Sequence, residues 1–115
     1  MAATKSELKA LVRRMSRLVE HIKSVSLALL NARAGELHVA VVVSGRIASM
    51  LVGSFDFGAV ESRVLYEVHP NLIRLARTDK KRLIQLKDVL LSVFQDMCKH
   101  VELKIQGLTK DPELA

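Results

Sequence analysis

The sequence predicts an all-α protein, a small antiparallel helical bundle in which all 115 residues form a single domain. Three observations predict this fold class. Apolar residues recur at helical spacing in two long segments, one towards each end of the chain. Only five glycines and two prolines are present, so turns are few and the elements must be long. No two segments alternate with the period of two that paired β-strands require.

Residues 4–33 are expected to form the first long helix. Thr4 and Glu7 have the spacing of a capping box at its start. Gly35 follows the helix and is expected to adopt the left-handed conformation that often ends one. Apolar residues step by three and four along the helix and form a heptad seam. The seam consists of Leu8, Leu11, Met15, Leu18, Ile22, Val25 and Leu29.

Residues 37–53 are apolar on every side, and we expect them to form a buried second helix that the other elements surround. The segment is too short, and too polar at its centre, to span a bilayer comfortably, so no membrane is among the expected partners. Gly45 lies within a run of small residues at helical spacing. Because glycine lowers helix stability, it suggests a position where a neighbouring helix leaves no room for a side chain.

Arg46 is the single charge within this apolar segment. A buried guanidinium must be paired, so we expect it to pair across the hairpin with Glu61 or, failing that, with Glu67 or Asp56. The alternative is that its stem is buried and its charged head reaches water.

Residues 57–69 are expected to form a third helix, which Pro70 kinks or ends before a short helix over residues 71–77. The second long helix covers residues 79–107. It either continues from the short helix or begins at a cap formed by Thr78 or Asp79. Gly107 is expected to end it, and residues 109–115 to form a flexible tail.

The bundle should therefore have two long outer helices, which extend beyond the buried second helix. The second long helix also carries two adjacent apolar seams, more than one neighbouring helix can cover. A second copy of the chain is the simplest cover for this surface, because two-fold dimers are the commonest oligomers. The expected interface residues are Leu91, Phe94, Cys98, Val101 and Ile105.

The net charge is +6, with a basic excess at both ends and an acidic excess over residues 34–70. A basic surface can bind the phosphate backbone of RNA or DNA. No aromatic residue lies within the densest basic cluster to stack on a base, so such binding would have little sequence specificity. The cluster consists of Arg74, Arg77, Lys80, Lys81 and Arg82.

Arg63, Tyr66, Glu67 and His69 lie in the segment RVLYEVHP. Their spacing resembles the ribonuclease motif of HEPN-domain proteins, which are small helical dimers that cleave RNA at the dimer interface. The resemblance implies catalytic roles for Arg63 and His69. Val64 departs from the family pattern, because a polar residue often follows the arginine there. The motif also lies further from the end of the chain than is usual in the family.

Other enzyme signatures are nearly absent. The sequence has no glycine-rich phosphate loop and no paired cysteines, and its four histidines lack the spacing of a metal site. We therefore expect no cofactor or metal, and binding rather than catalysis. A lone Cys98, with no visible N-terminal signal, suggests a cytoplasmic protein.

The expected function is that of a small helical interaction or scaffolding accessory subunit, homo-oligomeric through its long-helix seams. Its expected partner is itself, with another protein subunit as a further candidate. The alternatives are a basic subunit associated with RNA or DNA, and a HEPN-like ribonuclease.

Overall fold

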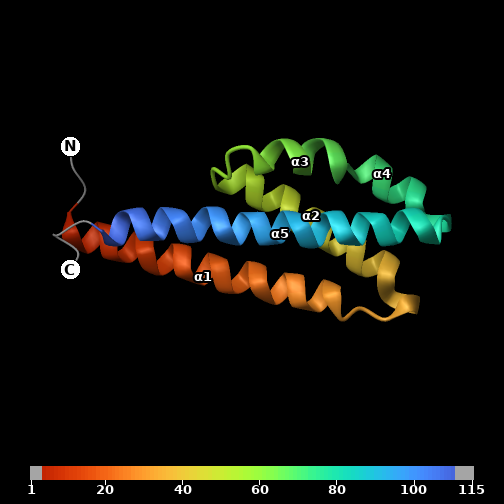
Figure 1. The fold of residues 1–115 in the computed structure, drawn as a ribbon, viewed down its shortest axis with the longest axis horizontal. Coiled ribbons are helices and arrows are strands. Elements are labelled where there is room, and N and C mark those ends of the chain that lie inside the picture. Colours follow the sequence, from red (N-terminus) through yellow and green to blue (C-terminus); the bar gives the residue numbers. More distant parts are fainter. Residues whose placement is uncertain (1–3, 111–115) are drawn as a thin grey trace.

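The computed structural model describes residues 4–110, and within this range every regular element is helical, which confirms the all-α bundle. The molecule is elongated, with extents of 54 × 24 × 16 Å (Figure 1). The elements in chain order are α1 (Lys5–Leu30), the 3₁₀ turn η1 (Ala34–Glu36), α2 (Leu37–Ser54), α3 (Val60–Glu67), α4 (Pro70–Leu75), the 3₁₀ turn η2 (Ala76–Thr78) and α5 (Lys80–Thr109).

Helix α1 begins as its sequence predicts, because the Thr4 side chain accepts a hydrogen bond from the Glu7 backbone N–H at 3.1 Å. It ends earlier than expected, at Leu30. Gly35 lies in the 3₁₀ turn and does not have a positive φ, so the predicted left-handed cap is wrong. The carbonyl of Leu30 instead accepts a hydrogen bond at 3.2 Å from Lys87 Nζ of α5, which joins the end of α1 to the second long helix.

Helix α5 is the element on which the bundle is built. It runs antiparallel to α1 along most of its length and also contacts α2, α3 and η2 (Figure 1). Phe94, Cys98 and Val101 of one apolar seam are buried. The adjacent seam is buried throughout and consists of Leu83, Leu86, Leu90, Val93 and Met97. As the sequence predicts, a single neighbouring helix, α1, does not cover both apolar seams of α5. The additional cover comes from α2 and α3 of the same chain.

Helix α2 differs from the expectation of a helix buried on every side. One face packs inwards and contains Val41, Ala48 and Leu51, whereas Val39, Val43 and Met50 on the opposite face are exposed. By length and composition alone, the helical stretch 34–54 could also cross a membrane, and about a third of its most apolar part is buried inside the bundle. The core helix of a soluble protein passes the same test, so the membrane indication is weak.

The connection between α2 and α3 is anchored by side chains as well as by backbone. Phe57 is fully buried, and its ring lies 4.9 Å from the ring of Phe55. The Asp56 carbonyl oxygen lies 3.0 Å from Nε2 of His100 and accepts a hydrogen bond at 3.1 Å from Lys104, so α5 holds the loop at two points. Gly58 has a φ of 59°, a conformation that favours glycine.

Pro70 separates two short helices, as the sequence predicts. It occupies the first turn of α4, where its missing N–H has no helical partner to lose. Asp79 caps α5 by accepting a hydrogen bond from the Arg82 N–H at 3.1 Å, so the chain does not run through residues 70–107 as one helix. Helix α5 passes through Gly107 and ends at Thr109, two residues later than expected. Residues 111–115 of the predicted tail lie outside the described range.

Candidate functional site

The two residues of the RVLYEVHP motif have structural partners. Arg63 on α3 pairs with Asp96 of α5, donates a hydrogen bond to Ser92 Oγ at 3.0 Å, and lies 3.6 Å from the Glu67 carboxylate. The His69 ring accepts a hydrogen bond from the Asn71 N–H through Nδ1 at 3.1 Å and thereby caps α4. Arg63 therefore joins α3 to α5, and His69 orders the start of a helix.

The basic cluster of residues 74–82 is divided among three elements. Arg74 lies on α4 and Arg77 on η2, whereas residues 80–82 form the first turn of α5. Residues 74–82 therefore do not lie on one continuous helix. All five side chains are exposed. The basic residues of α5 also lie at a helix N-terminus, where the helix dipole disfavours positive charge.

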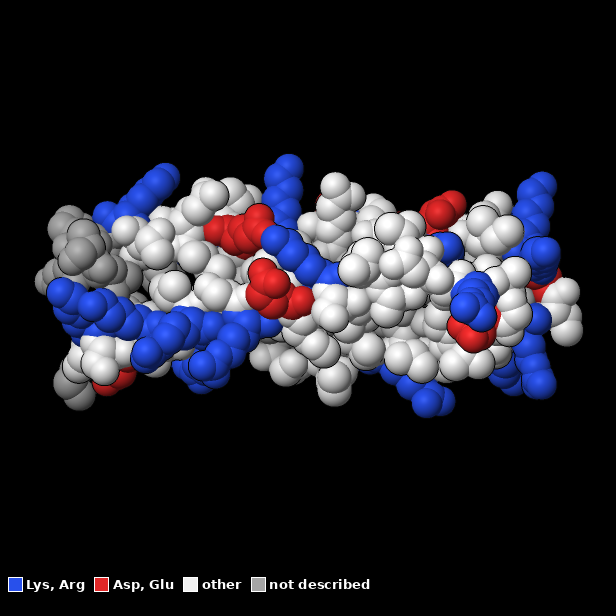
Figure 2. Space-filling model, turned by 90° about the horizontal axis from the view of Figure 1, so that it is seen from below, with Lys and Arg blue, Asp and Glu red and all other residues white. Residues whose placement is uncertain are grey.

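The two basic regions of the chain lie at opposite ends of the long axis. The N-terminus of α1 is at one end of the molecule, and α4 and the start of α5 are at the other (Figure 1). On the face formed by α1, Lys and Arg gather over the N-terminal part of the helix, and the surface towards its C-terminal part is largely uncharged (Figure 2). The two regions do not combine into one continuous basic surface.

Three of the five expected interface residues line a groove of about 680 Å³ between α1 and α5, which we call the α1–α5 groove. Leu91, Phe94 and Cys98 line it from α5, whereas Val101 is fully buried in the core and Ile105 lies outside the groove. The groove is lined by Lys23, Ser26, Leu27, Leu30, Leu91, Phe94, Gln95, Cys98, Lys99 and Glu102.

The α1–α5 groove has charges of both signs along its sides. Lys23 of α1 lies 3.4 Å from the carboxylate of Glu102 on α5, and Lys99 is a second cation. Burial raises the pKa of the Cys98 thiol, and the charge of Glu102 adds to this effect. The thiol therefore stays protonated at neutral pH and acts as a small apolar side chain in the groove wall.

A second groove, of about 430 Å³, lies between α2 and α4, and we call it the arginine groove. The sequence did not predict it, because Arg46 was expected to be buried and paired with a carboxylate. The lining residues are His38, Val42, Gly45, Arg46, Ser49, Val68, Pro70, Ile73, Arg74 and Arg77. Arg74 and Arg77 of the predicted phosphate-binding cluster thus belong to this groove, together with Arg46 of α2.

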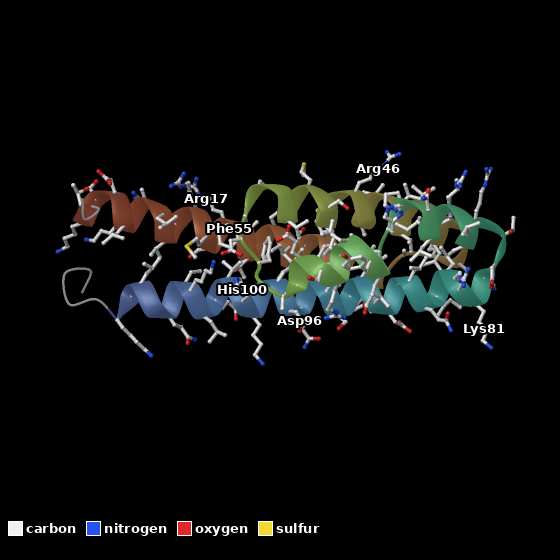
Figure 3. The ribbon with its side chains drawn as sticks, turned by 90° about the horizontal axis from the view of Figure 1, so that it is seen from above. Arg17, Arg46, Phe55, Lys81, Asp96 and His100 are labelled. Atoms are coloured by element: carbon white, nitrogen blue, oxygen red, sulfur yellow. The ribbon has the colours of Figure 1, made fainter. Side chains whose placement is uncertain are left out.

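The predicted ion pair of Arg46 is wrong. Arg46 is exposed on α2 and points away from the rest of the molecule, on the side opposite Lys81 and Asp96 (Figure 3). Two of its proposed partners are paired elsewhere, Asp56 with Lys104 and Glu67 with Arg63. The guanidinium group of Arg46 reaches water, as the alternative expectation held, because no other helix covers that side of α2.

Neither a metal site nor a similarity to a known protein identifies a function for the described part of the chain. Within residues 4–110, no three His, Cys, Asp or Glu side chains come together as a metal site. No known protein family, characterised protein or solved structure matches the chain. The two grooves and the apolar side chains beside them are the candidate binding surfaces of the molecule.

Proposed function

We propose that the protein is a small helical interaction subunit that self-associates through the α1–α5 groove. The observation that carries this proposal is the pair Leu27 and Leu30, each more than half exposed, beside a groove whose wall includes Leu91 and Phe94. Large aliphatic side chains at the edge of an apolar groove are typical of a protein-binding surface.

The charges around the groove support a second copy as the partner. A two-fold axis places the same surface on both subunits, so each charged residue must meet a complementary one from an identical chain. The α1–α5 groove carries Lys23 and Lys99 as well as Glu102, and it can therefore complement itself. The partly buried Leu91 and the exposed leucines supply the apolar contact that such an association requires.

Light scattering or sedimentation on a dilution series tests this proposal. The wild-type protein should form particles heavier than the 12.8 kDa chain at micromolar concentration. Replacing Leu27 and Leu30 by Glu should shift the protein to monomer with its helix content unchanged, because both side chains are exposed. Leu103→Glu is the matched control, since Leu103 is equally exposed on α5 but lies outside the groove.

Two results contradict self-association through this surface. One is a wild-type protein that remains monomeric over the whole dilution series. The other is a Leu103→Glu variant that dissociates as readily as the Leu27→Glu, Leu30→Glu double variant.

A role in binding the phosphate backbone of RNA or DNA is the second proposal. The exposed basic side chains on the N-terminal part of α1 favour it (Figure 2). The basic cluster of residues 74–82 lies at the other end of the molecule (Figure 1). A cytoplasmic location is likewise proposed, on the single cysteine and its suitability for a reducing compartment.

A further inference from the structure

The charge of the arginine groove has a single sign. Arg46 of α2, Arg74 of α4 and Arg77 of η2 line it, and the charged end of Arg46 points outwards into solvent (Figure 3). No acidic residue is among its lining residues. Val42, Val68 and Ile73 provide an apolar lining between these cations. A partner that fits this surface needs apolar side chains for the groove and carboxylates for the guanidinium groups.

The apolar surface continues beyond the groove along the outer face of α2. Val39, Val43 and Met50 are 63%, 47% and 61% exposed, and together with Arg46 they follow the heptad spacing of a helix-binding seam. From Val39 to Met50 the seam spans about 16 Å at the helical rise of 1.5 Å per residue. This length matches a partner helix of about three turns.

His38 adds a polar group to the wall of the same groove. Its Nε2 atom is buried and has no hydrogen-bond partner within residues 4–110. A buried ring nitrogen without a partner is costly, because its bond to water is lost and not replaced. Because this atom is covered by the chain itself, a polar side chain of a bound partner would reach it only if the surrounding groove side chains moved aside.

We propose that the arginine groove and the adjoining seam of α2 dock an acidic amphipathic α-helix of a partner protein. The partner's apolar residues at i, i+3, i+4 and i+7 would pack on Val39, Val43 and the groove lining. Its carboxylates would pair with Arg46, Arg74 and Arg77.

A second copy of the chain is a poor occupant here. A two-fold contact on this surface would bring arginines against arginines, and juxtaposed like charges disfavour association. The inference does not depend on self-association through the α1–α5 groove, since the two surfaces share no lining residue.

The test uses a designed, fluorescently labelled peptide of about four helical turns, with leucines on one face and glutamates beside them. Two control peptides have the same composition in scrambled order, or lysine in place of glutamate. The full chain should bind only the acidic amphipathic peptide, measured by fluorescence anisotropy at low salt. Replacing Arg46, Arg74 and Arg77 together by Gln should weaken binding at least about tenfold, because hydrogen bonds between charged groups are lost.

The matched control is the triple variant Lys80→Gln, Lys81→Gln and Arg82→Gln. It removes the same number of positive charges from neighbouring residues that do not line the groove. Its affinity should stay within about twofold of the wild type, since distant surface charges are screened by salt. The double variant Val39→Glu, Val43→Glu should abolish peptide binding. It should leave the fold intact, because both side chains are exposed.

Several outcomes overturn the proposal. Equal losses in the two triple variants would show a general attraction to positive charge. Equal binding of the scrambled peptide would show that the protein does not recognise the amphipathic face of a helix. Binding to vesicles of phosphatidylserine and phosphatidylcholine with the same arginine dependence, without binding to the peptide, would assign the surface to an anionic membrane. The particle mass of each arginine-groove variant, measured by light scattering, should equal that of the wild type, which separates loss of peptide binding from loss of self-association.

Discussion

Gly45 lies where α2 packs against Ile73 of α4, and a side chain added there tests how the bundle is packed. A Cβ atom built on Gly45 would lie 2.6 Å from Cδ1 of Ile73, closer than two carbon atoms can pack. The next atom, Cγ1 of Val68, is at 3.6 Å and makes an ordinary contact. The substitution Gly45→Ala therefore meets one specific obstacle, which is the terminal methyl group of a buried isoleucine.

Two opposing effects set the magnitude. Alanine stabilises a helix interior by about 1 kcal/mol relative to glycine. Overpacking a filled core costs about 1–3 kcal/mol. In the wild-type background, Gly45→Ala should thus lower the free energy of unfolding by about 0–2 kcal/mol. Ile73→Val removes the obstructing methyl group and costs about 0.5–1.5 kcal/mol by itself.

The decisive quantity is the effect of alanine in the Ile73→Val background. With the methyl group removed, only the helix propensity remains, and Gly45→Ala should raise the free energy of unfolding by about 1 kcal/mol. The two substitutions should therefore couple by about 1–3 kcal/mol. Urea denaturation of the four proteins in this cycle measures the coupling. Additive effects would refute the close approach of α2 and α4, and with it the shape of the arginine groove.

Two further predictions concern contacts to α5. Arg63→Met should lower the free energy of unfolding by about 1–2 kcal/mol, because the side chain is 31% exposed and joins α3 to Asp96 and Ser92. Glu67→Gln should lower the free energy of unfolding by less than about 0.5 kcal/mol, and urea denaturation measures both variants. Equal losses in the two variants would contradict the role of Arg63 in joining α3 to α5. The Asp56 carboxylate accepts the Gly58 N–H, and this bond, together with the charge of Lys104, lowers the pKa of Asp56 below its ordinary value. Its contribution to stability is then present above the unfolded-state pKa and is lost as the pH falls through the lower folded-state pKa. The deficit of Asp56→Asn in urea midpoint should accordingly be seen at neutral pH and disappear in acid, whereas a deficit independent of pH would exclude this contribution.

Local signals in the sequence were sufficient to predict where several of the helices begin. Thr4 and Asp79 cap α1 and α5 because a side-chain oxygen beside the first turn satisfies a free backbone N–H of the same segment. Pro70 separates α3 from α4 because its ring restricts the residue before it. The absence of side-chain space at Gly45 was also predicted correctly, from the cost of glycine in a helix.

The two grooves depend on contacts between distant segments, and sequence spacing alone indicated them only in part. Leu91, Phe94 and Cys98 were selected because their stripe is apolar, but α1 covers part of that stripe and leaves a groove beside Leu27 and Leu30. Val101 belongs to the same apolar stripe, and it is buried in the core because neighbouring helices of the same chain cover it. A periodic pattern shows which residues share a face of a helix, and it does not show how many neighbours pack against that face.

The sequence by itself determined the helices of this protein, because caps, breaks and apolar periodicity act between residues close together in the chain. Only the tertiary structure decided which side of α2 faces outwards. An apolar helix of this kind can be buried on any side, and the choice depends on where α4 and α5 pack. That packing leaves Val39, Val43 and Met50 exposed. It also makes Arg46 line the same groove as Arg74 and Arg77, which are 28 and 31 residues further along the chain.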